Sequence, residues 1–266
     1  MDKEIETTIK ALISRNINAI FAENGDEAKK KILDLIPHDA IVGIGDSATV
    51  VQIGVKEEIK RRGTRMLDGF DQDIVYSSLK DYDECHWNMI KESNKKCDVF
   101  LTGTNAITQD GRLVNVDGSG NRVSGMFWGP KASVIVIGRN KLVKNLDEAF
   151  YRIRNVIAPT HIRIGSVEIG GRRQGNKPCA TTGECRDCRT RDRMCNIFTI
   201  IEGKPSQIDM TVILVNEDLG LSWDKSWPKE RISKIVENYK RFSFFNVRRE
   251  LLRREVSILS KSQIQK

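Results

Sequence analysis

The sequence has no long apolar run, and no stretch approaches the roughly 20 residues that a helix needs to cross a bilayer. Its first residues, Met1-Asp-Lys-Glu-Ile-Glu6, are acidic and lack the apolar core of a secretory signal. We therefore expect a cytoplasmic protein without a transmembrane segment. At 266 residues, of which 39% are apolar and 30% charged, the chain can bury a substantial core.

Several familiar catalytic signatures are also missing. The sequence has no Ser-His-Asp set and no P-loop, and Gly43-x-Gly45 alone is too short for a dinucleotide-binding fingerprint. It also lacks internal repeats and low-complexity segments. Candidate sites must therefore be sought in glycine turns, polar loops and cysteines.

The net charge of +8 is concentrated at one end of the chain. Residues 223–266 hold 12 Lys or Arg against 5 Asp or Glu, which leaves only +1 for the rest. We expect an α/β domain over residues 1–222 and a basic helical extension over 223–266. The extension is either a solvated amphipathic segment or a contact for an acidic partner, a membrane surface or nucleic acid. Acidic residues are interspersed among its basic ones, and this mixed charge argues against nucleic acid.

A short apolar strand beginning at Ala40 runs into a glycine turn and then into a helix that begins near Ser47 and reaches Ile59. Free N–H groups and the helix dipole favour an anion at such a helix start, and the hydroxyls of Ser47 and Thr49 add donors. The alternative is that Asp46 or Ser47 simply caps the helix.

The stretch from Phe100 to Lys131 is the most informative part of the chain. It predicts a buried strand over 98–101, a polar loop, a short strand over 113–116 and a glycine-rich turn. A further internal strand over 133–137 ends at Gly138-Arg-Asn-Lys141. Polar groups at the carboxyl ends of strands mark ligand sites in open α/β sheets. The alternative is a set of hairpin turns, for which Asp117-Gly118 is a good signal.

Apolar spacing and turn residues predict the remaining elements. We expect helices over 4–22, 26–36, 146–158 (ended by Pro159), 229–242 and 247–259, and paired or adjacent strands over 196–201 and 209–215.

Four of the six cysteines lie within a loop over 170–196 that has no apolar period. Cys179, Cys185, Cys188 and Cys195 follow the spacing C-x5-C-x2-C-x6-C. In a reducing compartment this cluster indicates a metal site rather than disulfides, and four thiolates suit zinc or an iron–sulfur cluster. Six arginines over 172–193 would offset the thiolate charge. The alternative is a loop of free thiols.

A set of motifs in fixed order resembles the lactate-utilisation (LUD) domain family, in its cysteine-bearing branch. The resemblance covers roughly residues 4 to 220, and the basic extension lies outside it. The motifs are Gly43-Ile-Gly-Asp-Ser-Ala-Thr49, Thr102-Gly-Thr-Asn-Ala-Ile-Thr108, Asp117-Gly-Ser-Gly-Asn-Arg122, Gly129-Pro-Lys131, Gly138-Arg-Asn-Lys141 and Pro178-Cys-Ala-Thr-Thr-Gly-Glu-Cys-Arg-Asp-Cys188.

The resemblance implies a mostly parallel, three-layer α/β sandwich like that of sugar-phosphate isomerases and coenzyme A transferases. It also implies a part in oxidising L-lactate to pyruvate beside iron–sulfur partner proteins. We expect a small anionic substrate, and the cysteine centre, if it is an iron–sulfur cluster, would pass electrons to or from a partner. The candidate ligand-binding residues are Gly43, Gly45, Asp46, Ser47, Thr49, Thr104, Asn105, Asp117, Asn121 and Lys131.

Two other functions stay open at this point. One is an isomerase-like or transferase-like enzyme on a phosphorylated or acyl substrate, with Asp46 or Asp117 as general base and Lys131 binding the anion. The other is a non-enzymatic binding or regulatory protein whose basic extension contacts nucleic acid.

Overall fold

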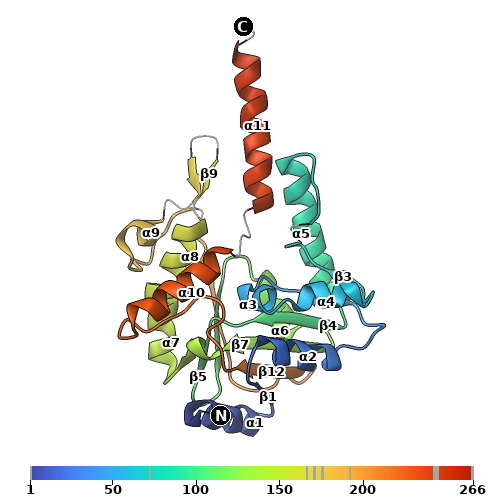
Figure 1. Cartoon of the computed structure of the whole chain (residues 1–266), viewed down its shortest axis with the longest axis vertical. Helices are drawn as coiled ribbons and strands as arrows, with labels where there is room; N and C mark the ends of the chain where they lie inside the picture. Colours follow the sequence, from blue (N-terminus) through green and yellow to red (C-terminus); the bar gives the residue numbers. More distant parts are fainter. Residues whose placement is uncertain are drawn as a thin grey trace.

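A six-stranded sheet of parallel strands forms the centre of the computed structural model (Figure 1). The structure describes residues 2–71, 73–165, 167–169, 172–174, 177–191, 193–241 and 246–264. In spatial order the strands are β1 (Asn18–Ala22), β12 (Asp209–Val215), β7 (Ala132–Gly138), β4 (Val99–Gly103), β2 (Val42–Ile44) and β3 (Met66–Leu67). The mostly parallel α/β fold predicted from the sequence is confirmed.

The central strands are apolar along their whole length because both of their faces are covered. In β7, Val134 and Val136 pack into one buried cluster, while Ile135 and Ile137 pack into another on the opposite face. This division follows from the alternation of side chains across a strand. Apolar runs of this kind are typical of a sheet between two layers.

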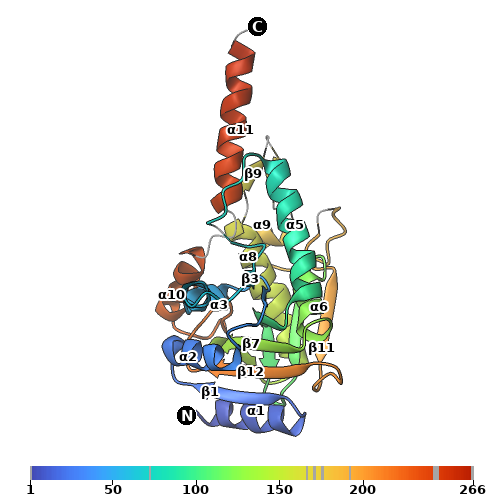
Figure 2. The same ribbon diagram turned by 90° about the vertical axis from the view of Figure 1, so that its right-hand side faces the viewer.

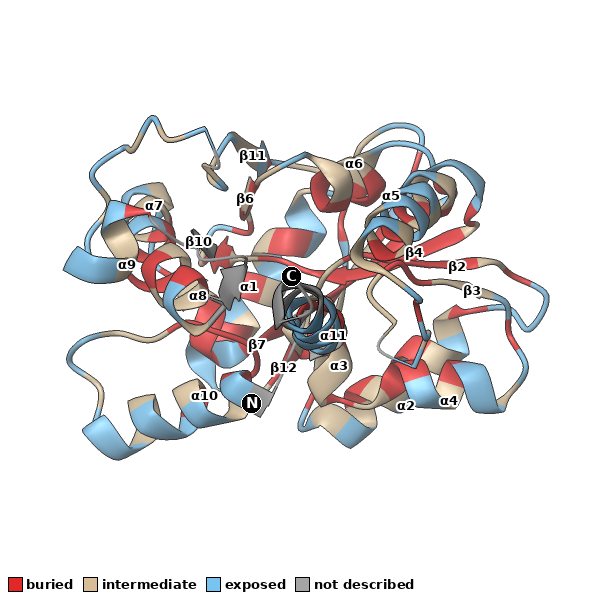
Figure 3. Ribbon diagram, turned by 90° about the horizontal axis from the view of Figure 1, so that it is seen from above, coloured by how far each residue is buried: buried red, intermediate tan, exposed pale blue. Residues whose placement is uncertain are grey.

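Helices cover both faces of the sheet, which gives three layers. Figure 3 shows α5 and α6 on one side and α2 and α4 on the other. The first side also carries α1, and the second carries α3. The bounds are α1 (Lys3–Ser14), α2 (Gly25–Leu35), α3 (Ala48–Gln52), α4 (Val55–Arg61), α5 (Leu79–Lys96) and α6 (Asn121–Phe127).

A second, four-stranded sheet follows the order β11-β6-β5-β8. Its strands are β11 (Ile197–Ile201), β6 (Leu113–Asp117), β5 (Ala106–Thr108) and β8 (Leu142–Val143). The expectation that segments 196–201 and 209–215 form paired or adjacent strands was wrong, because the two strands belong to different sheets. β11 pairs with β6, whereas β12 pairs with β1 and β7.

The predicted helix over 4–22 is two elements rather than one. Helix α1 ends at Ser14, and Asn16 adopts a left-handed φ of 61°, which Asn tolerates better than most residues. Residues 18–22 then form β1, the parallel edge partner of β12. Ile17 and Ile20 continue the helical spacing of α1, but they pack against the sheet.

Pro159 does not end its helix as expected. Helix α7 (Leu146–Arg152) passes through a π-helical turn, Ile153–Ile157, into α8 (Ala158–Gly165). The changed hydrogen-bond pattern of the π turn lies just before the proline, where a missing N–H would otherwise interrupt an α-helix.

The carboxyl-terminal half adds short elements and two further helices. They are β9 (Val167–Ile169), β10 (Arg172–Gln174), α9 (Pro178–Thr182), α10 (Lys229–Arg241) and α11 (Asn246–Ile264). Helix α11 extends away from the body beside the end of α5 (Figures 1 and 2). Within the described ranges, no helix is both long and apolar enough to cross a membrane.

Candidate functional site

Loops that follow separate strands meet around a cavity of about 330 Å³. The loop after β2 contributes Asp46 and Ser47, and the loop after β4 contributes Thr104 and Asn105. The carboxyl ends of parallel strands lie at one edge of a sheet, so these polar groups converge although they are far apart in sequence. The turn after β6 adds Asp117 through Ser119, together with Asn121 and Arg122.

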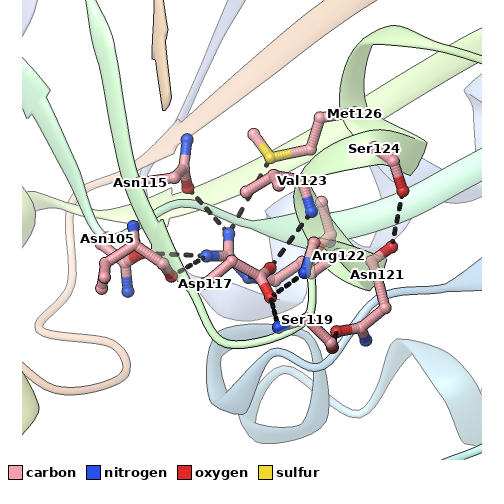
Figure 4. A network of polar contacts seen from close by, with 12 residues as sticks. Asn105, Asn115, Asp117, Ser119, Asn121, Arg122, Val123, Ser124 and Met126 are labelled. Carbon is pink, nitrogen blue, oxygen red and sulfur yellow. Dashed lines mark hydrogen bonds and ion pairs between the residues drawn. The ribbon is translucent and has the colours of Figure 1, made fainter. Parts of the chain in front are cut away.

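Arg122 holds these loops in place (Figure 4). One guanidinium nitrogen donates to Asn115 Oδ1 at 2.7 Å and to Gly103 O at 3.2 Å. The other donates to Asn105 Oδ1 and Val116 O, each at 2.9 Å. Because its donors already have protein acceptors, we interpret Arg122 as a positioning residue beneath the cavity.

Asp117 is likewise committed to local structure. Its Oδ1 accepts hydrogen bonds from the backbone N–H of Gly120 at 2.9 Å and of Ser119 at 3.2 Å. Its Oδ2 accepts from Val123 N at 3.3 Å and lies 3.8 Å from Arg122 Nε. The carboxylate therefore fixes the glycine turn and the start of α6, as Figure 4 shows. These contacts make it a poor candidate for a mobile general base.

Asp46 has chemistry better suited to proton transfer. Burial raises the pKa of its carboxyl to about 6, and Asp117 and Asp68 add to the rise, while Arg122 opposes it. Burial, with a smaller effect of Asp46, also raises the pKa of the Tyr239 hydroxyl. A carboxyl that titrates near neutrality is suited to give or take a proton at physiological pH.

Lys141 is the second unusual group that lines the cavity. Only 7% of the residue is exposed, and its Nζ donates to Thr49 Oγ1 at 2.9 Å and to Thr104 O at 3.2 Å. Burial, and then the positive charge of Arg122, lower the pKa of its amine to about 7. Gly220 has φ 71°, and a Cβ there would lie 2.8 Å from Lys141 Nζ. The positive φ and this close approach together favour glycine at position 220.

Helices α8 and α10 form another wall of the cavity. His161 of α8 is hydrogen-bonded through Nδ1 to the hydroxyl of Tyr239 of α10. Burial lowers the pKa of His161 to about 4, so the imidazole is neutral at pH 7. Tyr239 belongs to the segment beyond residue 222, so the basic extension supplies part of the cavity wall.

Six of the ten candidate ligand-binding residues line this cavity: Asp46, Ser47, Thr104, Asn105, Asp117 and Asn121. Ser47 also caps α3, because its Oγ accepts from Val50 N at 3.3 Å. Ser47 therefore both caps the helix and lines the cavity, so its geometry is compatible with helix capping and with anion binding. Thr104 is buried, and its hydroxyl donates to Asn115 Oδ1 at 3.0 Å.

Three other candidates do not line this cavity. Gly43 faces α5, where a Cβ would come within 2.5 Å of Ser93 Oγ. Gly45 lines a smaller adjoining cavity, and a Cβ there would lie 2.6 Å from Thr102 Oγ1. Thr49 is fully buried and accepts the hydrogen bond of Lys141. The lack of a side chain at the two glycines lets Ser93 and Thr102 pack closely, and the Thr49 hydroxyl holds the amine of Lys141.

Lys131 is not brought to the cavity. Its side chain is 85% exposed, and its Nζ forms an ion pair with Asp98 at 2.8 Å. The motif Gly129-Pro-Lys131 leads into β7, so Lys131 lies near the amino end of that strand, opposite the edge where the loops converge. The lysine that follows the carboxyl end of β7 and lines the cavity is Lys141.

Sequence reasoning omitted several groups that shape the cavity. Two of them lie in motifs that the sequence does show: Lys141 ends the motif that follows β7, and Arg122 ends the motif that begins at Asp117. His161 and Tyr239 had no recognisable signal, because they come from helices distant in sequence.

The segment that holds the four clustered cysteines reaches this cavity at Cys195. Each is partly exposed with a free thiol, and Cys195 also lines the cavity. Burial and then the other three thiols, with Arg193 opposing, raise the pKa of Cys195 to about 11. The thiols are therefore close enough to interact electrostatically. Within the described part of the chain, no three His, Cys, Asp or Glu side chains are arranged to hold a metal ion. Residues 170, 171, 175, 176 and 192 of the predicted loop lie outside that part.

Comparisons with known proteins identify a family. A model described as LUD domain matches residues 5–215. Two solved structures are similar at low identity. A DUF162 family protein from Deinococcus radiodurans is 12% identical over 80% of this chain and 96% of its own, with a TM-score of 0.44. A D-ribose-5-phosphate isomerase in complex with phospho-erythronic acid is 19% identical over 46% of this chain and 54% of its own, with a TM-score of 0.28. No curated protein matches the sequence.

Proposed function

The chain belongs to the LUD domain family, and on that premise we propose that it acts in lactate utilisation by binding a small 2-hydroxy or 2-oxo carboxylate in the cavity. The observation that carries the proposal is the position of Cys195, which lines the same cavity as Asp46 and Lys141. A ligand held there would lie beside the four-cysteine segment. The specific reaction that we propose is the oxidation of L-lactate to pyruvate, in a cytoplasmic setting that keeps thiols reduced.

The cavity offers the amine of Lys141 for the ligand's negative charge and the carboxyl of Asp46 for its hydroxyl proton. Conversion of a 2-hydroxy acid to a 2-oxo acid removes the hydroxyl proton, the C2 proton and two electrons; the C2 proton would leave to water, and the two electrons would pass one at a time to the iron–sulfur partner proteins. Asp46 is the carboxyl suited to take the hydroxyl proton, because its pKa lies near 6. Asn105 and Asn121 supply polar contacts that orient the ligand.

Four cysteines are the residue types that suit a thiolate-bound centre, and their side chains would have to draw together to hold one, because they are not so arranged in the described structure. Cys179, Cys185, Cys188 and Cys195 would provide four sulfur ligands, as zinc and iron–sulfur clusters both accept. Arg193 links two of their backbones by donating to Cys188 O at 2.7 Å and Cys195 O at 2.9 Å. An iron–sulfur cluster, when bound, supplies one-electron transfer, and iron–sulfur partner proteins would exchange those electrons.

Anaerobic purification of the full chain, with metal analysis and an absorption spectrum, tests this proposal. We expect bound iron in the wild type, its loss in Cys188→Ser, and its retention in Cys85→Ser, which changes an exposed thiol in α5. We also expect lactate-dependent reduction in a system reconstituted with iron–sulfur partners. Protein with neither bound iron nor lactate-dependent redox activity would contradict the proposal.

The same cavity favours one alternative, an isomerase-like or transferase-like reaction on a phosphorylated or acyl substrate. The specific observation is that Asp46, with its raised pKa, and the buried Lys141 line one cavity, as a general base and an anion-binding group would. A thermal-shift screen of sugar phosphates against hydroxy acids separates the two. If no phosphate stabilises the protein, this alternative is eliminated.

A further inference from the structure

Lys141 is buried without a carboxylate partner among the residues that the structure describes. An ammonium group has three donors. Two of them bond to neutral oxygens, Thr49 Oγ1 at 2.9 Å and Thr104 O at 3.2 Å, and Lys141 forms no ion pair with a carboxylate of the described residues. Burying a charge without an opposite charge is costly. Lys141 therefore differs from Lys56, which is equally buried but forms an ion pair with Asp68.

The surrounding chain holds the amine in this position. Asn140, which precedes Lys141, is fully buried and clamps the loop that follows β12. Its Nδ2 donates to Ser222 O at 3.1 Å, and its Oδ1 accepts from Leu219 N at 3.0 Å. The same loop places Gly220 against Lys141 Nζ. The amine is thus preorganised at the wall of the cavity.

We propose that Lys141 is the counter-ion for the anionic group of the ligand, and that its ammonium acquires an opposite charge only when a ligand enters. In the proposed function, on which this inference rests, that group is the carboxylate of the hydroxy or oxo acid. Arg122 is a weaker choice, because its donors already bond to Asn105, Asn115 and backbone carbonyls. A carboxylate is the natural acceptor for the remaining donor direction of the lysine.

Binding should then be coupled to proton uptake. With a pKa of about 7, the amine is largely neutral at pH 8, and an incoming anion favours its protonated form. Affinity should therefore fall as the pH rises from 6 to 9. The charged and titratable groups that share the cavity with Lys141 are Asp46, His86, Asp117, Arg122, His161, Cys195 and Tyr239. Asp46 ionises near pH 6, and its negative carboxylate then repels the anionic ligand, which adds to the fall in affinity.

Isothermal titration calorimetry of the full chain tests the proposal. The probes are L-lactate, pyruvate and inorganic phosphate, each in two buffers of different ionisation enthalpy at pH 8. We expect proton uptake by the wild type, and a roughly ten- to hundredfold loss of affinity with loss of that uptake in Lys141→Met. The matched control is Lys131→Met, which removes an exposed lysine and should bind as the wild type does.

The outcomes separate this inference from the proposed function. Wild-type affinity and proton uptake in a folded Lys141→Met protein would overturn the role of the lysine and leave lactate binding intact. Lysine-dependent binding of phosphate alone would support the lysine and contradict the lactate assignment. If Lys141→Met does not fold, the wild type still decides: binding without proton uptake at pH 8 would overturn the inference, and so would no binding of any probe.

Discussion

Arg122 and Lys141 are both cationic and buried, yet their surroundings give them different roles. Arg122 bonds to side-chain and backbone oxygens of three segments, so it fixes the loops. Among the described residues, Lys141 has only two acceptors, both neutral, so it can respond to a ligand. Asp46 is the corresponding acidic group, since burial brings its pKa close to neutrality. At this scale, burial and hydrogen-bond partners distinguish supporting groups from reactive ones.

Asp46→Asn should stabilise the folded protein at neutral pH. Because the pKa of Asp46 is raised in the folded protein, its protonated carboxyl stabilises the fold at low pH. This stabilisation is complete below the ordinary pKa of an aspartate and is lost as the pH rises through about 6. At pH 7.5 the neutral amide should therefore be more stable by about 1 kcal/mol, after allowance for partial exposure. Urea unfolding at pH 4 and pH 7.5 measures this, and the difference should shrink at pH 4. The exposed Asp34→Asn is the control; an equal effect of both substitutions at pH 7.5 would contradict the account.

Gly220→Ala should weaken anion binding, whereas Gly63→Ala should not. Both glycines have positive φ, 71° and 76°, so either alanine should cost about 1 kcal/mol of stability through backbone strain. At position 220 the new Cβ would lie 2.8 Å from Lys141 Nζ. At position 63 the new Cβ would have no atom within 4 Å. Calorimetry and urea unfolding of both variants make the comparison. Equal affinities in the two would show that the approach of Gly220 to Lys141 has no role in binding.

The elements show what sequence patterns can and cannot predict. The buried strands were predictable because apolar runs end at glycine and polar turns, as at Gly103 and Gly138. The helix over 4–22 was overextended, because Ile17 and Ile20 fit a helical spacing while serving a parallel edge strand. Tyr239 could not have been predicted, because no local pattern reports that α10 folds back to the cavity.

Arg231→Ala should loosen α10. The guanidinium donates two hydrogen bonds to Asp218, each of 2.7 Å, and lies 3.5 Å from the ring centroid of Trp227. Loss of these contacts should cost roughly 1–3 kcal/mol and speed amide hydrogen exchange over residues 229–241. Hydrogen exchange detected by mass spectrometry measures this. Lys240→Ala, which removes a largely exposed i,i+3 ion pair with Glu237, is the control and should leave exchange unchanged. Unaltered exchange in Arg231→Ala would mean that other contacts hold α10.

Across the whole molecule, the two edges of the sheet carry different groups. One edge gathers Asp46, Asn105 and Lys141 around the cavity, with Cys195 at its rim. The opposite edge carries the exposed ion pair of Lys131 with Asp98. The first helix of the basic extension contributes to the cavity wall, whereas α11 extends away from it (Figure 1). The candidate ligand-binding groups and Cys195 are thus brought together by topology rather than by proximity in sequence.

The most direct test of this arrangement is a crystal structure of the full chain, purified anaerobically and grown with pyruvate. We predict pyruvate in the cavity, with its carboxylate at Lys141 Nζ and its remaining polar atoms facing Asp46 and Asn105. Pyruvate bound elsewhere on the molecule, or in the cavity with its carboxylate turned away from Lys141, would contradict the account.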